Sequence, residues 1–292
     1  MSNPRIPFEL SSDRGSLSPP GGKPVLVHIV INVEYWVFEA EMPRKLLTAP
    51  HGLEQVPDIP NYSWAEYGMR CGMPRLLQCL TERQLPASVS LNAGVIEAYP
   101  SLARAMLEAG WEFIGHGLHQ KSIQGENQEE DLIAKSLDLI ERFTGARPKG
   151  WLGPGLKETL ETPDILKKLG VKYVFDWVLD DLPCWMSTQH GPLLSLPYTL
   201  ELNDSVIYAV EKHASPEMSR RLDDTLSVFE KEVIDQPRVL TLGLHPHLIG
   251  VPHRFFYLEA MLDLLISRGD THFLTGQEIA KWYEAVCPPP EK

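Results

Sequence analysis

The stretch VLVHIVI, residues 25–31, is an unbroken run of mostly β-branched side chains around a single histidine. Such a run is typical of a strand buried on both faces, as in a parallel sheet covered by helices. Further apolar runs follow, separated by segments with the spacing of helices that bury one face. This alternation predicts parallel strands with right-handed crossovers, and therefore an α/β fold. We expect His28, inside the run, to be a core histidine.

The pattern predicts the following elements and segments, in chain order. Strands are expected over 25–31, 87–91, 111–114, 150–152, 172–175, 206–210, 239–244 and 271–274, and helices over 76–83, 100–109, 126–143, 158–169, 218–234, 258–267 and 276–285. Residues 37–66 and 176–204 are irregular connections, and the length of the first is typical of a lid or substrate-binding loop. The Ser-, Pro- and Gly-rich residues 1–23 are expected to form a flexible arm, 24–286 one catalytic domain and 287–292 a tail.

Composition narrows the class of partner. The chain has 292 residues and a net charge of −12, without a basic run long enough to follow a phosphate backbone. This argues against nucleic acid and anionic membrane surfaces as partners, and favours a small-molecule substrate. The four cysteines show no CxxC pair, which argues against a zinc ribbon. No apolar run approaches the roughly 20 residues that span a bilayer, and no leader is recognised, so we expect a cytoplasmic protein.

Polar side chains follow three of the expected strands at their carboxyl ends. Asn32 and Glu34 follow the first strand, and alternation places them on the same face. His116 stands between two glycines after a later strand, and His245 follows the last long buried run. Because strand ends of a (β/α) barrel meet on one rim, these side chains are expected to face one site. A carboxylate with two imidazoles suits hydrolysis, since such groups can activate water, stabilise an oxyanion and protonate a leaving atom.

Structural interpretations of these residues remain open. Glu34 is also compatible with a salt-bridged loop carboxylate, and Arg70 with a surface ion pair in place of a planar amide or carboxylate ligand. The Gly-Pro-Gly turn at 153–155 is suited to presenting amides to an oxyanion or simply to ending a strand. Of Asp180 and Asp181, at most one is expected to face a site, because adjacent side chains of an extended chain point in opposite directions.

Several ordered segments carry a resemblance to a known family. They are Asn32-Val33-Glu34, Tyr67-Gly68-Met69-Arg70-Cys71-Gly72, Gly115-His116-Gly117, Arg147-Pro148-Lys149-Gly150-Trp151, Asp180-Asp181-Leu182-Pro183, the stretch 196–204 and Gly243-Leu244-His245 followed by Leu248-Ile249-Gly250. On these segments the chain resembles the polysaccharide deacetylase (NodB-homology) superfamily, and most closely its branch of allantoinases and cyclic imide hydrolases. The resemblance runs from Val30 to Tyr283. It implies a single-domain, deformed seven-stranded (β/α) barrel.

The departures from the family pattern bear on the cofactor. The metal-dependent members carry two nearby aspartates on the first strand, where this chain has Asn32 and Glu34, and a second histidine where it has Gln120. Zinc is usually held by about three protein ligands, and only Glu34 and His116 stand at matching positions. We therefore expect no cofactor. The alternative is one divalent metal such as zinc, held by Glu34, His116 and His119.

The favoured interpretation is a hydrolase of a non-peptide carbon–nitrogen bond that opens a small cyclic amide, imide or ureide. In it, Glu34 accepts a proton from water, His116 orients or polarises the scissile carbonyl, and His245 protonates the leaving nitrogen. The expected substrate contacts are Asn32, Tyr67, Arg70, Gln120, Trp151, Gly153, Asp181, His247 and Arg254.

Two other functions stay open. One is a metal-dependent deacetylase acting on an acetylated carbohydrate. The other is a catalytically silent relative that binds a small molecule. Asn32 and the absence of the second family histidine are compatible with it. A homo-oligomer is expected, because related enzymes assemble and the N-terminal arm is suited to a subunit contact.

Overall fold

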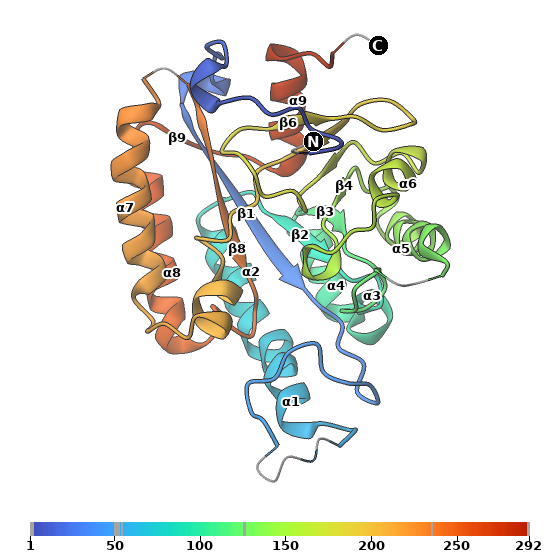
Figure 1. Cartoon of the computed structure of the whole chain (residues 1–292). Helices are drawn as coiled ribbons and strands as arrows, with labels where there is room; N and C mark the ends of the chain where they lie inside the picture. The colour runs from blue at the N-terminus through green and yellow to red at the C-terminus, as the bar shows by residue number, and fades with distance from the viewer. Residues whose placement is uncertain (1–2, 50–52, 54, 125–126, 235, 291–292) are drawn as a thin grey trace.

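The computed structural model describes residues 3–49, 53, 55–124, 127–234 and 236–290. Its centre is strand β1 (Val25–Val33), which is buried along its whole length (Figure 1). One edge of β1 pairs with β8 (Arg238–Leu244) over seven positions. On the other side, β9 (Thr271–Phe273) pairs with the first residues of β1 and β2 (Ser88–Leu91) with the last. The apolar run that opened the sequence is thus the strand around which the sheet is built.

The sheet is a deformed barrel of the expected kind. Seven parallel strands follow one another in the order β7 (Leu193–Ser195), β5 (Tyr173–Val174), β4 (Gly150–Trp151), β3 (Glu112–Gly115), β2, β1 and β8, while β9 pairs with β1 and β6 (Cys184–Met186) runs antiparallel at the far edge. Beyond β7 the chain runs irregularly beside β8, where Gly243 N donates to Leu202 O (3.0 Å) and Thr241 Oγ1 donates to Pro197 O (2.9 Å). Irregular backbone therefore takes the place of a regular strand pair at this point of the curled sheet.

Most helices cover the outside of the sheet, whereas α1 (Ile59–Tyr67) lies beyond the carboxyl end of β1 (Figure 1). The helices are α1, α2 (Met73–Glu82), α3 (Val95–Ala98), α4 (Pro100–Glu108), α5 (Glu129–Thr144), α6 (Thr162–Lys168), α7 (Glu217–Glu232), α8 (Pro252–Ser267) and α9 (Gly276–Val286), with π-helical turns at Gly68–Gly72 and Ser205–Val210 and 3₁₀ turns at Ser11–Asp13, Pro20–Gly22 and Pro154–Leu156. Helix α5 illustrates the local logic: it buries Ile133, Leu137 and Ile140 on one face and ends at Gly145, whose φ of 78° suits glycine.

Several predicted elements differ from the structure. The expected strand over 206–210 is the π-helical turn Ser205–Val210, which packs Ile207 and Tyr208 into the core. The irregular stretch 176–204 contains β6 and β7, whose three residues each are too short for a period to register. Helix α8 begins at Pro252, six residues earlier than expected, as suits a proline in a first helical turn.

The N-terminal segment, expected to be a flexible arm, lies against the barrel over its described residues. Ile6 is buried, and Arg5 pairs with Asp164 (2.6 Å). Further along, the indole N–H of Trp282 donates to Ser18 O (2.8 Å). These contacts tie the segment to its own chain. Within the described ranges, no helix has the length and apolarity needed to span a membrane.

Candidate active site

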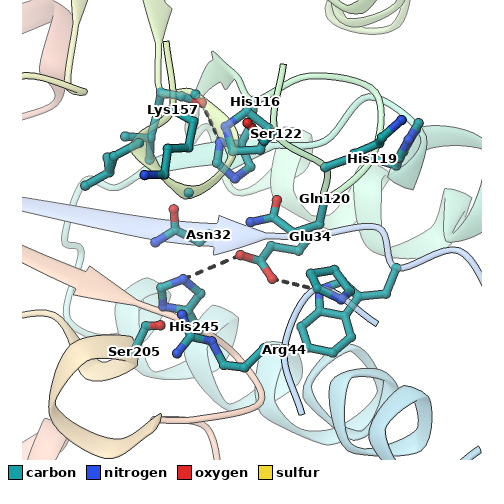
Figure 2. A pocket seen from close by; sticks show the side chains of 18 of the residues that line it. Asn32, Glu34, Arg44, His116, His119, Gln120, Ser122, Lys157, Ser205 and His245 are labelled. Atoms are coloured by element: carbon teal, nitrogen blue, oxygen red, sulfur yellow. Dashed lines mark hydrogen bonds and ion pairs between the residues drawn. The ribbon is translucent and has the colours of Figure 1, made fainter. Parts of the chain in front are cut away.

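The main pocket has a volume of about 880 Å³ and opens at the carboxyl ends of β1, β3, β4 and β8. Asn32, Glu34, His116 and His245 all line it, so the structure brings the predicted strand-end residues together (Figure 2). Part of the connection 37–66 forms a further wall, through residues 37 and 40–44. The convergence follows from the parallel topology, which points all these strand ends at the same rim.

Glu34 is 8% exposed and follows the last residue of β1. Its Oε2 accepts a hydrogen bond from the indole N–H of Trp36 (2.7 Å), and its Oε1 lies 3.6 Å from Nε2 of His245. Burial raises the pKa of this carboxyl, and the opposing effect of His245 and of the Trp36 hydrogen bond does not cancel the rise. A carboxylate with a raised pKa is suited to accept a proton from water near neutral pH.

His245 is held by a carboxylate that the sequence analysis did not assign to the site. Asp204 is fully buried and accepts from Nδ1 of His245 (2.6 Å), from the backbone N–H of His245 (2.7 Å) and from that of Ile249 (3.1 Å). Burial acts to lower the pKa of His245, but the charge and hydrogen bond of Asp204, with the charge of Glu34, outweigh it, and the pKa is raised. His245 is therefore suited to hold a proton on Nε2 beside Glu34.

His116 has the opposite character. Its Nδ1 lies 2.5 Å from the carbonyl oxygen of Leu152, which can only accept, so Nδ1 carries the hydrogen. Burial lowers the pKa of His116 to about 4, which leaves the ring neutral. Its Nε2 is buried and makes no hydrogen bond within the described part of the chain. In this tautomer Nε2 offers a lone pair to the pocket, where it is suited to orient a substrate by accepting a hydrogen bond.

Asn32 and Tyr198 form a second polar unit in the pocket wall. Asn32 Nδ2 donates to the Tyr198 hydroxyl (3.0 Å) and to Leu244 O (3.2 Å), which leaves its Oδ1 as the group offered to the pocket. The Tyr198 oxygen also accepts from Asn203 Nδ2 (3.1 Å). Burial raises the pKa of Tyr198, so its own O–H stays a donor. Sequence reasoning missed Tyr198, because it lies in irregular chain that only the closure of the barrel brings here.

Four of the remaining predicted residues also line the pocket. They are His119, Gln120, Gly153 and His247. The buried Oε1 of Gln120 makes no hydrogen bond to any residue the structure describes. The ring of His247 packs against Trp36 and Trp64, and burial lowers its pKa well below the usual range, so it contributes a neutral ring.

The other predicted substrate contacts lie elsewhere. The Arg70 side chain is 75% exposed and pairs with Glu66 one helical turn away, and the hydroxyl of Tyr67 accepts from Arg75. Trp151 is fully buried in the core behind β4. The guanidinium of Arg254 lies 4.2 Å from the ring centre of Tyr208, outside the pocket lining. Asp181 is exposed on the surface, also outside the lining. These predictions were wrong for one reason. A sequence motif does not show whether its side chain, on a helix or on a strand, points to the pocket or away from it.

The motif at residues 67–72 has a packing role instead. It forms the π-helical turn Gly68–Gly72 against the loop that carries His245 and His247. A Cβ at Gly68 would collide with the backbone of His247, and one at Gly72 with that of Pro246. The two glycines therefore let the helical turn approach the loop that carries His245 and His247 at backbone distance.

Replacing Gly72 with alanine is expected to lower stability by about 2–4 kcal/mol, because the added methyl meets rigid backbone. It should also displace His245 and reduce any turnover. Thermal unfolding and activity measure the two effects, and Gly269→Ala is the matched control, since nothing lies within 4 Å of a Cβ there. Equal melting temperatures for the two variants would contradict this account.

The side chains do not fit the family's metal site. Within the described ranges, no group of three or more His, Cys, Asp and Glu side chains is arranged to hold a metal ion. Glu34, a predicted ligand, already has its two oxygens directed at Trp36 and His245. The position of the second family histidine holds Gln120, an uncharged amide. This donor set lacks the three carboxylate and imidazole ligands that zinc usually takes.

The chain is similar to a family model, to curated proteins and to solved structures. A family model for polysaccharide deacetylase matches residues 62–174. A Schizosaccharomyces pombe protein assigned by name to the polysaccharide deacetylases is 28% identical, over 92% of this chain and 93% of its own length. Among solved structures, a Pseudomonas aeruginosa protein likewise named for polysaccharide deacetylase is 27% identical with a TM-score of 0.83, covering 95% of this chain and 97% of that one. An allantoinase structure is 25% identical with a TM-score of 0.83, covering 96% of both chains.

Proposed function

We propose that the chain, whose residues 62–174 match the polysaccharide deacetylase family model, hydrolyses a non-peptide carbon–nitrogen bond and opens a small cyclic amide, imide or ureide. The observation that carries this proposal is the Glu34–His245–Asp204 line in the pocket: a buried carboxylate 3.6 Å from a histidine that a second buried carboxylate holds. This line supplies a base and an acid from side chains alone. The likeness to an allantoinase over nearly the whole chain supports the same class of reaction.

In the proposed reaction, Glu34 takes a proton from a water molecule as the water oxygen attacks the scissile carbonyl carbon. The new C–O bond forms, and the π electrons of the carbonyl move to its oxygen. The O–H of Tyr198, whose oxygen already accepts from two amides, is placed to donate to that negative oxygen. His245 then gives its Nε2 proton to the nitrogen as the C–N bond breaks.

The same contact restores the starting state. After the reaction Glu34 is protonated and His245 is neutral. Their 3.6 Å separation lets the proton pass from Glu34 Oε1 to Nε2 of His245 with a small movement of either side chain. The products are a carboxyl group, formed as the carbonyl is restored, and the released nitrogen group, which is an amine from a cyclic amide, an amide from an imide and a urea group from a ureide; in a ring substrate both remain in one molecule. One water is consumed and no proton is left over on the protein.

The other wall of the pocket suits the N–H groups of such a ring. His116 Nε2 and Gln120 Oε1 are both acceptors, both buried and both without a hydrogen bond to the described residues. The N–H groups of a ureide or imide could donate to these two acceptors. In this function His116 positions the substrate by accepting, while Glu34 and His245 move protons.

The second candidate, a metal-dependent carbohydrate deacetylase, is favoured by the family model and by the names of two relatives. The third, a silent relative that binds a small molecule, is favoured by Asn32, which cannot act as a base. Both candidates use the same pocket as the first. The deacetylase needs a metal for turnover, and the silent relative binds its ligand without turnover.

One screen tests the three candidates. Protein treated with a chelator is assayed against a panel of cyclic amides, imides, ureides and acetylated amino sugars, with and without added zinc. We expect ring opening by the metal-free protein and no gain from zinc. Turnover of acetylated sugars only after zinc addition would replace the first candidate with the second. Binding without turnover across the panel would leave the third.

A further inference from the structure

Arg44 is a pocket-lining cation without a hydrogen-bond or ion-pair partner among the residues that the structure describes. It comes from the connection that covers the pocket and is half-buried beside Glu34 and His245 (Figure 2). It makes no hydrogen bond or ion pair with any described residue, while its charge acts on Glu34 and His245. Arginines of similar burial elsewhere are paired: Arg14 with Asp180 (2.8 Å) and Arg268 with Asp270 (2.7 Å). Arg44 therefore stands out as a guanidinium whose donors face the pocket unused.

Glu34 does not neutralise this charge. One of its oxygens accepts from Trp36 and the other faces His245, so neither is committed to the guanidinium. The other carboxylate of the lining, Glu41, is exposed. Besides His245, three basic side chains line the same pocket: Arg44, Lys121 and Lys157. Figure 2 shows Lys157 on the His116 side and Arg44 on the opposite side of Asn32 and Glu34.

The local excess of cations runs against the charge of the whole chain. The protein carries a net charge of −12 and so repels anions at long range. A pocket lined by three cations and two carboxylates reverses that sign where the substrate binds. A neutral acetylated sugar would gain nothing from such a reversal. An anionic substrate would gain both an orientation and a charge-assisted hydrogen bond.

We propose that Arg44 binds a carboxylate group of the substrate, and that the natural substrate is a cyclic amide or ureide bearing a carboxylate. This inference rests on the proposed function. The planar guanidinium offers paired N–H donors that match the two oxygens of a carboxylate. Its position beside Glu34 and His245 would hold the carboxylate at one end of the ring and the scissile amide over the catalytic pair.

Two pairs of probe substrates test the assignment. Dihydroorotate and dihydrouracil share a six-membered ureide ring and differ by one carboxylate; hydantoin-5-acetate and hydantoin make a similar comparison on a five-membered ring. The measured quantity is the ratio of kcat/KM for the carboxylated ring to that for the neutral ring. We expect this ratio to be about 30 or more in the wild type, the range of a charge-assisted hydrogen bond. It should fall as ionic strength rises, because salt screens the pair.

Arg44→Gln is expected to lower that ratio by about 30-fold, and Arg44→Lys to lower it less, because the charge stays and the planar fork is lost. Using a ratio cancels any effect of Arg44 on the pKa values of Glu34 and His245. The matched control is Arg70→Gln, which removes the same charge from an exposed position outside the pocket and should leave the ratio unchanged.

The outcomes separate this inference from the proposed function. Efficient opening of the neutral rings with a ratio near one, or an unchanged ratio in Arg44→Gln, would overturn the role of Arg44 and leave the hydrolase proposal standing. If no ring is opened at all, the proposed function fails. Binding of the same four compounds to wild type and to Arg44→Gln is then measured by calorimetry. The ratio of the Kd of the neutral ring to that of the carboxylated ring should fall in Arg44→Gln if Arg44 binds the carboxylate, and an unchanged ratio would overturn that role.

Discussion

Replacing Glu34 with glutamine should lower kcat for ring opening by about 10³-fold, within the usual contribution of a general base, while the protein still folds. Glutamine has the shape of glutamate and can still accept from Trp36 through its amide oxygen. It cannot take a proton from water. It also removes a charge that helps keep His245 protonated, so both proton transfers are weakened by one change.

The measurement is steady-state kinetics on the best ring substrate, combined with thermal unfolding. Glu112→Gln is the matched control, because Glu112 is another carboxyl whose pKa burial raises, but it lies outside the pocket and bonds Ser88, Tyr173 and the start of α9. We expect that control to lose stability and to keep kcat within about threefold. Near-wild-type turnover by Glu34→Gln would refute the assignment of the base.

The second large effect concerns His245. Replacing it with asparagine should reduce kcat by about 10²–10³-fold on unactivated amides, because the leaving nitrogen then departs without a proton. The loss should be much smaller on substrates whose leaving nitrogen carries an electron-withdrawing group. A similar loss on both kinds of substrate would indicate that His245 is needed for structure and does not act as the acid.

The pH profile gives an independent view of the same pair. Activity needs Glu34 deprotonated and His245 protonated, so it should rise with pH through the raised pKa of Glu34, above 4.5, and fall through the raised pKa of His245, above 6.5. Asp204→Asn removes the carboxylate that most raises the pKa of His245, and the falling limb should therefore move to lower pH. Asp164→Asn, at a carboxylate that pairs with Arg5 outside the pocket, should leave both limbs in place. An unmoved limb in Asp204→Asn would contradict the role of Asp204.

Local patterns predicted more of the fold than of the site. The long apolar run at 25–31 became β1, and helices such as α5 follow their one-faced spacing. The failures were short or context-dependent segments: β6 and β7 have three residues each, and the β-branched stretch at 206–210 coils to bury Ile207 and Tyr208. In those places contacts made by other parts of the chain override local preference.

Within the site, the predicted residues that converge lie at the carboxyl ends of strands or in the loops that follow them. Glu34, His116 and His245 face one pocket because parallel strands end on one rim. Arg70 and Trp151 stood in equally recognisable motifs and lie elsewhere, since the first is on an exposed helical face and the second in the core.

Sequence alone therefore determined the alternation of strands and helices, the rim on which polar groups would gather, and the carboxylate and imidazoles that follow its strands. Only the tertiary structure decided the pairing of Asp204 with His245, the contact of Tyr198 with Asn32, the neutral state of His116 and the position of Arg44 in the pocket lining. The physical reason is the range of the interactions. Strand and helix patterns are written into neighbouring residues, whereas a hydrogen bond between residues 41 positions apart, or a pKa set by burial, exists only once the barrel has closed.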